Sequence, residues 1–311
     1  MKTVLLAGAG FSRWSCQLPL VSELFDFKIQ ADTDLEERRL SRLEKKYQSW
    51  LNANPNGHAE AFIKFSQDTN KGFNLVNWYI TRRLAEPFIK KSGRRYTWYI
   101  NSYHPNRSDG IAKARTIVET LKNAAPGGQL SIVTTNYDLI FEYCLSTRGF
   151  NYGIANEQIG FTPYPYPRPL HVTGDIQISK LHGSISWSEH DKFPDSRLGL
   201  TGKCLIVPPI AEKTAPPLLK SQWQFAEASL QTCDTLVVFG FSFNEQDAAI
   251  RDFISKSVPL KCQIVLVDVV DFRKKIKPLF EAQTLTFIDA NSKTLASAVT
   301  KAVAPAESQA N

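Results

Sequence analysis

Short runs of aliphatic residues alternate with segments of helical periodicity along most of this chain, and this alternation constrains its fold more than any other feature. Several runs are apolar from end to end, as expected of strands that helices cover on both faces of a sheet. We therefore expect an α/β fold built on a Rossmann-like, doubly wound parallel sheet. The predicted strands are residues 3–7, 130–134, 178–181, 204–207, 235–240, 263–268 and 284–288, and the predicted helices are residues 138–146, 217–230, 245–255, 273–282 and 292–303.

Residues 35–124 depart from this pattern, because their apolar residues recur at helical rather than strand spacing. The sequence predicts a helical subdomain there, inserted into a sheet domain that residues 1–34 and 125–311 form together. The insertion contains 17 basic and 8 acidic residues, a net charge of +9, against 20 basic and 22 acidic residues elsewhere. We expect a surface that attracts acidic partners at its basic cluster, which consists of Arg82, Arg83, Lys90, Lys91, Arg94 and Arg95.

Composition excludes several classes of protein. The longest apolar runs, such as residues 236–241, fall far short of the ~20 residues that a membrane-spanning helix needs. The apolar amino terminus is interpreted as a buried strand and turn rather than a secretion signal. The five cysteines are odd in number and include no C-x-x-C pair, so neither a disulfide framework nor a zinc site is indicated. We expect a cytoplasmic protein without a bound metal ion.

The first predicted strand is followed by a glycine-rich turn, Gly8-Ala9-Gly10-Phe11-Ser12. Small residues between a strand and a helix let the backbone approach a pyrophosphate, and the helix start offers free N–H groups. Arg13 stands where the dinucleotide fingerprint of ordinary dehydrogenases has its third glycine, which disfavours that class. The alternative interpretation is a tight strand-to-helix turn without a ligand.

The second turn, Thr135-Asn136-Tyr137-Asp138, follows the predicted strand at 130–134 and precedes a helix. Because ligands of doubly wound sheets bind beyond the carboxyl ends of the strands, Asn136 and Asp138 are predicted to face a ligand there. The alternative is that Asp138 only caps the following helix.

Two further turns occupy equivalent positions. His182 and Gly183 follow the predicted strand at 178–181, so the imidazole can reach the same edge, although a lone histidine is more often structural. Gly240 and Ser242 follow the strand at 235–240 and offer backbone amides and a hydroxyl to a phosphate or ribose. An ordinary helix cap at residues 244–247 would explain the polar residues after them equally well.

Taken in order, the four turns resemble the sirtuin family, with its glycine-alanine-glycine-x-serine, threonine-x-asparagine-x-aspartate, histidine-glycine and glycine-x-serine motifs. The resemblance covers residues 3–16 and 130–290 and implies a sirtuin-type domain with NAD+ as substrate. Deacylating sirtuins have a glutamine where this chain has Thr135, and they carry a zinc module of two cysteine pairs that this chain lacks. The pattern is more similar to bacterial sirtuin-like NAD+ hydrolases, many of which deplete NAD+ in anti-phage defence.

The resemblance also implies roles for individual residues. Asn136 would hold the ribose or the attacking water, and His182 would act as the general base, for which an imidazole pKa near 6.5 is suited. Asp138 and Tyr137 would receive the carboxamide of nicotinamide. The residues assigned to binding of NAD+ are Gly8, Ala9, Gly10, Phe11, Ser12, Thr135, Tyr137, Asp138, Gly240, Ser242 and Asp268.

Other functions remain open at this point. A protein deacylase would use the same Asn136 and His182, and a non-catalytic sensor of NAD+ or ADP-ribose would need the binding residues only. The basic insertion is compatible with a homo-oligomer, with a regulatory partner protein such as an ATPase or a nucleic-acid-sensing component, or, less favoured, with direct binding of nucleic acid. No association with a membrane is expected.

Overall fold

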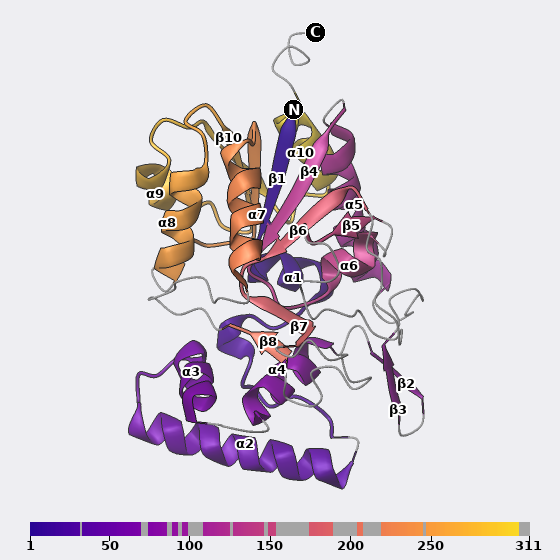
Figure 1. Cartoon of the computed structure of the whole chain (residues 1–311), viewed down its shortest axis with the longest axis vertical. Coiled ribbons are helices and arrows are strands. Elements are labelled where there is room, and N and C mark those ends of the chain that lie inside the picture. Colours follow the sequence, from indigo (N-terminus) through magenta and orange to yellow (C-terminus); the bar gives the residue numbers. More distant parts are fainter. Residues whose placement is uncertain are drawn as a thin grey trace.

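A seven-stranded parallel sheet forms the centre of the molecule in the computed structural model (Figure 1). Its strand order is β11-β10-β9-β1-β4-β6-β5, so the chain builds outward from β1 in two directions. The doubly wound α/β fold predicted from the sequence is confirmed. The structure describes residues 1–31, 33–69, 74–85, 89–92, 95–98, 108–124, 127–145, 149–153, 174–188, 204–207, 219–244 and 247–304.

The sheet strands coincide with six of the seven predicted runs. They are β1 (Lys2–Ala7), β4 (Gln129–Thr134), β6 (Ile176–Lys180), β9 (Thr235–Phe239), β10 (Gln263–Asp268) and β11 (Leu285–Asp289), to which β5 (Phe150–Asn151) adds an edge that was not predicted. Successive residues of β1 point to opposite faces, with Val4 and Leu6 in one apolar core and Leu5 and Ala7 in the other. Both faces are therefore buried, which explains why these strands are apolar throughout.

The seventh predicted strand lies elsewhere. β8 (Cys204–Ile206) pairs antiparallel with β7 (Gly183–Ser188) in a separate two-stranded sheet, so its placement in the parallel sheet was wrong. An apolar run of four residues shows only that a strand is buried, because the strand it pairs with is determined by residues distant in sequence. The carbonyl of His182 accepts a hydrogen bond from Val207 at 2.9 Å, which attaches this small sheet to the end of β6.

Helices cover both faces of the sheet (Figure 1). The helix α5, which the sequence groups with the insertion, packs against α1, α6 and α10 beside the sheet. None of the helices that the structure describes is both long and apolar enough to cross a membrane. The helices around the parallel sheet are α1 (Ala9–Cys16), α5 (Ser108–Ala124), α6 (Ile140–Leu145), α7 (Lys220–Gln231), α8 (Ala248–Ser257), α9 (Arg273–Ile276) and α10 (Leu295–Val303).

Three helices, α2 (Asp34–Ala53), α3 (Ala59–Thr69) and α4 (Leu75–Ala85), lie below the parallel sheet in Figure 1. The chain continues into an antiparallel hairpin of β2 (Ile89–Ser92) and β3 (Arg95–Trp98), which the helical interpretation of this segment did not include.

The predicted basic cluster is not a uniform surface. Arg82 is only 6% exposed, and its Nε lies 3.5 Å from Glu36 Oε1. Arg83 pairs with Asp26 at 3.2 Å. Two of its six members thus form ion pairs within the fold, and the other four lie outside the side chains that the structure describes.

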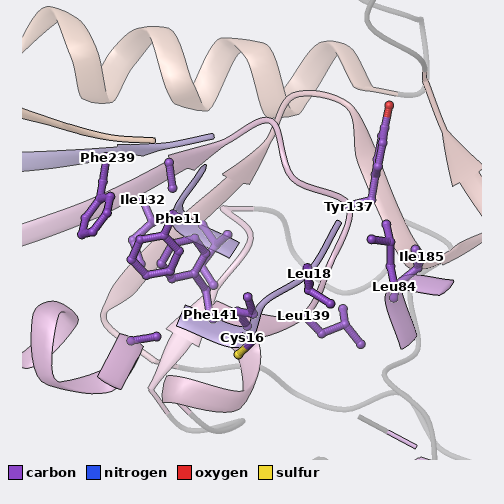
Figure 2. Packing of buried hydrophobic residues seen from close by; sticks show 14 of the residues in the cluster. Phe11, Cys16, Leu18, Leu84, Ile132, Tyr137, Leu139, Phe141, Ile185 and Phe239 are labelled. Atoms are coloured by element: carbon purple, nitrogen blue, oxygen red, sulfur yellow. The ribbon is translucent and has the colours of Figure 1, made fainter. Parts of the chain in front are cut away.

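Phe11 packs α1 onto the sheet. Its ring is fully buried, with centroid distances of 4.9 Å to Phe141 and 5.0 Å to Phe239 (Figure 2). We predict that Phe11→Ala lowers the free energy of unfolding by about 3–5 kcal/mol, as for other buried aromatic side chains. Urea denaturation measures the effect, with Phe65→Ala, at a ring that is 41% exposed, as the control of small effect. A loss below ~1 kcal/mol for Phe11→Ala would contradict this role.

Candidate functional site

The carboxyl ends of the parallel strands bring the predicted residues to one edge of the sheet. Residues 8–12 follow β1, residues 135–138 follow β4, His182 follows β6, and Gly240 and Ser242 follow β9. The chain leaves β1 toward β4 on one side, whereas β9 lies on the other side of β1. The candidate site therefore lies where the strand order reverses, which is the usual ligand position in doubly wound sheets.

The turns after β1 and β9 are in direct backbone contact. Gly10 N–H donates to the Gly240 carbonyl at 2.9 Å, and Gly8 N–H donates to the Phe239 carbonyl at 3.0 Å. A Cβ atom on Gly8 would lie 2.5 Å from the Gly240 oxygen, and one on Gly240 would lie 2.2 Å from the Phe11 nitrogen. Glycine is required at both positions. No side-chain hydrogen bond caps the start of α1 at Gly8. The N–H groups of Gly10 and Phe11 donate to the Gly240 and Gly8 carbonyls, so what this helix start offers an anion is mainly the positive end of the helix dipole.

Asn136 joins the turn after β4 to the turn after β1. Its Nδ2 donates to the Gly8 carbonyl and to Ser12 Oγ, each at 2.8 Å. Because a carbonyl oxygen can only accept, the contact with Gly8 determines which way the amide of Asn136 is turned. Both Nδ2 hydrogens are thereby used, so the atom that Asn136 can offer to a ligand is the acceptor Oδ1.

The carboxylate of Asp138 is directed into the protein. It accepts hydrogen bonds from Ser12 Oγ at 2.5 Å and from the backbone N–H of Ile140, at the start of α6, at 3.0 Å. Burial raises the pKa of Asp138, although the charge of Lys180 and these hydrogen bonds oppose that effect. The side chain of Asp138 therefore caps the start of α6, as the alternative interpretation of the sequence predicted, and it also bonds the turn after β1 through Ser12.

Tyr137 and His182 lie side by side and are both buried, with ring centroids 6.0 Å apart. Tyr137 Oη donates to the Val207 carbonyl at 2.9 Å. Burial raises the pKa of Tyr137 well above its ordinary value, so the phenol stays neutral. In Figure 2 the Tyr137 ring points away from the cluster around Phe11. Its hydroxyl is therefore used for the fold, and its ring forms a wall beside the imidazole.

The remaining predicted residues differ in how they lie relative to the edge of the sheet. Phe11 contributes its ring to the core, so only its backbone remains near the edge. Ser242 is exposed, and its carbonyl accepts a hydrogen bond from Lys275 Nζ at 3.0 Å. Asp268 ends β10, where its Oδ1 accepts from the backbone N–H of Val269 at 2.7 Å. Ala9 and Thr135 lie in their turns, where Thr135 N–H donates to the Ala7 carbonyl at 3.2 Å.

Sequence reasoning missed two charged residues behind the site. Lys180 Nζ lies 2.8 Å from Glu142 Oε1, and both side chains are buried. The signal was present, because a lysine within an otherwise buried strand is unusual unless it is paired.

Metal ligands do not gather in the part of the chain that the structure describes, where no group of three or more His, Cys, Asp or Glu side chains could hold an ion. All five cysteines are buried, and none forms a disulfide.

Comparison with known proteins relates these turns to a family. Residues 130–258 match the SIR2-like domain. The matched residues include the turns after β4, β6 and β9, and the match agrees with the sirtuin-like fold predicted from the motifs. No curated protein matches the sequence.

Among the solved structures that match, two align with most of the chain. One is a Sir2 homologue mutant in complex with 2′-O-acetyl ADP-ribose, which is 16% identical over 97% of this chain and 90% of that chain, with a TM-score of 0.46. The other is a Sir2 homologue mutant in complex with ADP-ribose, which is 15% identical over the same shares, with a TM-score of 0.44.

The contact between Gly8, Gly10 and Gly240 can be tested against a matched glycine. Gly240 and Gly127 both have positive φ angles, 64° and 66°, but a Cβ at Gly127 would have no atom within 4 Å. We predict that Gly127→Ala costs about 1–2 kcal/mol of stability through backbone strain alone. Gly240→Ala should cost clearly more, because it also separates the two turns. Equal losses in urea denaturation would show that the close approach contributes nothing.

Proposed function

We propose that this protein hydrolyses NAD+ at the bond between nicotinamide and ribose. The observation that carries the proposal is the linkage of Asn136 to both Gly8 and Ser12, each at 2.8 Å, at the end of a strand whose neighbour, β6, is followed by His182. A polar residue suited to the reacting ribose is thus attached to a turn suited to the diphosphate.

Binding follows from the arrangement of the turns. The diphosphate would lie against the backbone of Gly8, Ala9 and Gly10 and the start of α1. The adenosine half would extend toward Ser242 and Asp268, and the nicotinamide half toward the turn after β4. There the backbone of Thr135, Tyr137 and Asp138 would receive the carboxamide, since the side chains of Tyr137 and Asp138 are bonded within the fold.

The reaction breaks the bond from nicotinamide to ribose C1′ and joins a water oxygen to that carbon. Nicotinamide leaves with the bonding electron pair, and the products are nicotinamide, ADP-ribose and one proton. Asn136 Oδ1 would accept a hydrogen bond from the water or a ribose hydroxyl, because Nδ2 is already used. His182 would take the proton, and its burial beside Tyr137 limits access of bulk water.

The absence of the paired-cysteine zinc module from the sequence favours hydrolysis over deacylation. Both reactions begin with the departure of nicotinamide and differ in the nucleophile. The five cysteines lack the paired spacing of the zinc module that deacylating sirtuins carry, a module that helps shape their acyl-lysine groove. By resemblance, we assign the chain to bacterial NAD+ depletion in anti-phage defence. Because unrestrained hydrolysis would harm its own cell, control by self-assembly or by a regulatory partner belongs to this proposal.

The decisive experiment is incubation of the purified protein with NAD+, with and without an acyl-lysine peptide. We expect equal amounts of nicotinamide and ADP-ribose, independent of the peptide. Release of nicotinamide only with peptide, accompanied by O-acyl-ADP-ribose, would identify a deacylase instead. Binding of NAD+ without release of nicotinamide would identify a sensing module.

We predict that His182→Ala and Asn136→Ala each lower the rate of NAD+ cleavage by about 10²–10⁴, the usual contribution of a general base or of a group that orients the reactants. His58→Ala is the matched control, because His58 lies on the surface, where its Nδ1 is 3.0 Å from Glu60 Oε2. Steady-state kinetics on folded variants measure the effect. Turnover near the wild-type rate in either site variant would remove that residue from the mechanism.

A further inference from the structure

The most buried ion pair of the described residues lies directly behind the proposed site. Lys180 and Glu142 are 1% and 3% exposed, and Lys180 Nζ lies 2.8 Å from Glu142 Oε1. Removing two charges from water is expensive, and apolar residues of the same volume often give a more stable protein. Stability alone therefore does not account for this pair.

Lys180 has a second hydrogen-bond partner, the backbone carbonyl of Asp138. Lys180 is the last residue of β6, two positions before His182, and Asp138 is two positions after Asn136. The ammonium thus joins the ends of the two neighbouring strands that carry both proposed catalytic residues. Glu142 is itself held in place, since its Oε1 accepts from Tyr152 Oη at 2.9 Å.

The connection continues to Asn136 without a break. Asp138, whose carbonyl accepts from Lys180, uses its carboxylate to accept from Ser12 Oγ at 2.5 Å, and Ser12 Oγ accepts in turn from Asn136 Nδ2 at 2.8 Å. Every link in this chain is buried. Hydrogen bonds in such surroundings are strong, and a missing partner is costly.

We propose that Lys180 is a positioning residue for the NAD+ reaction. Its ammonium, anchored by Glu142, holds the Asp138 carbonyl and thereby the turn that presents Asn136 beside His182. This inference rests on the proposed function, because it assigns Lys180 a part in that reaction. An apolar residue could replace the volume of Lys180 but could not donate to Asp138.

The test distinguishes a positioning role of Lys180 from the cost of leaving one buried charge without its partner. In the double variant Lys180→Met with Glu142→Gln, both charges disappear together, and the glutamine still accepts from Tyr152. The matched control is Arg82→Met with Glu36→Gln, which removes a second buried ion pair, with atoms 3.5 Å apart, in the helical layer. A structural role would affect both variants alike.

We expect kcat of the Lys180 variant to fall at least tenfold with KM within about threefold of wild type, because misplacement of a reacting group lowers the chemical step first. Amide hydrogen exchange over residues 135–140 should accelerate at least tenfold in this variant. The control variant should retain the wild-type kcat, KM and exchange in that segment.

A kcat within twofold of wild type in the folded Lys180 variant would overturn the proposal. If the variant does not fold, Lys180→Gln with Glu142→Gln replaces it with the same criteria, since the two carboxamides can bond each other but the shorter chain cannot reach Asp138. If the wild-type protein does not cleave NAD+, the proposed function fails. Unchanged exchange over residues 135–140 would separately refute the positioning of the turn.

Discussion

The close approach of the turns after β1 and β9 is the contact on which the rest of the site depends. Gly8, Gly10 and Gly240 bring two backbones together with no side chain between them, and two hydrogen bonds of 2.9 and 3.0 Å hold them there. β1 lies between β9 and β4 in the sheet. The helix α1 begins at Ala9, directly after the contact at Gly8. The start of α1, the conformation of the glycine-rich turn and the position of the Gly8 carbonyl that accepts from Asn136 all depend on it.

A buried polar chain forms the second constraint. Lys180, Asp138, Ser12 and Asn136 connect the ends of β6, β4 and β1 by hydrogen bonds that bulk water hardly reaches. Such networks rigidify a protein when every member is satisfied and are costly when one is not. Fold and site are therefore not separable here. The groups that orient Asn136 also join the ends of three neighbouring strands, so we expect a change to any of them to affect both the stability of the fold and the geometry of the site.

The sheet was predictable because its strands are short, apolar and regularly separated by helices. The central strands could be predicted from their own composition, because strands buried on both faces are apolar throughout. The error at β8 has a physical reason, because an apolar run of four residues does not specify its partner strand. Two members of the basic cluster could not be placed from the sequence for a similar reason. The charges of Arg82 and Arg83 were visible in the sequence, but their partners Glu36 and Asp26 lie 46 and 57 positions away along the chain.

The sequence by itself determined which residues reach the edge of the sheet, because parallel strands carry the residues that follow them to a common side. Tertiary structure alone decided the direction of each side chain. Phe11 turns into the core, Asp138 turns back to Ser12, which is 126 positions away, and Tyr137 bonds Val207, which is 70 positions away. Lys180 acquires a role only through contact with Glu142 and Asp138. The physical reason is that a hydrogen bond joins atoms that are close in space, and periodicity along the chain does not record that proximity.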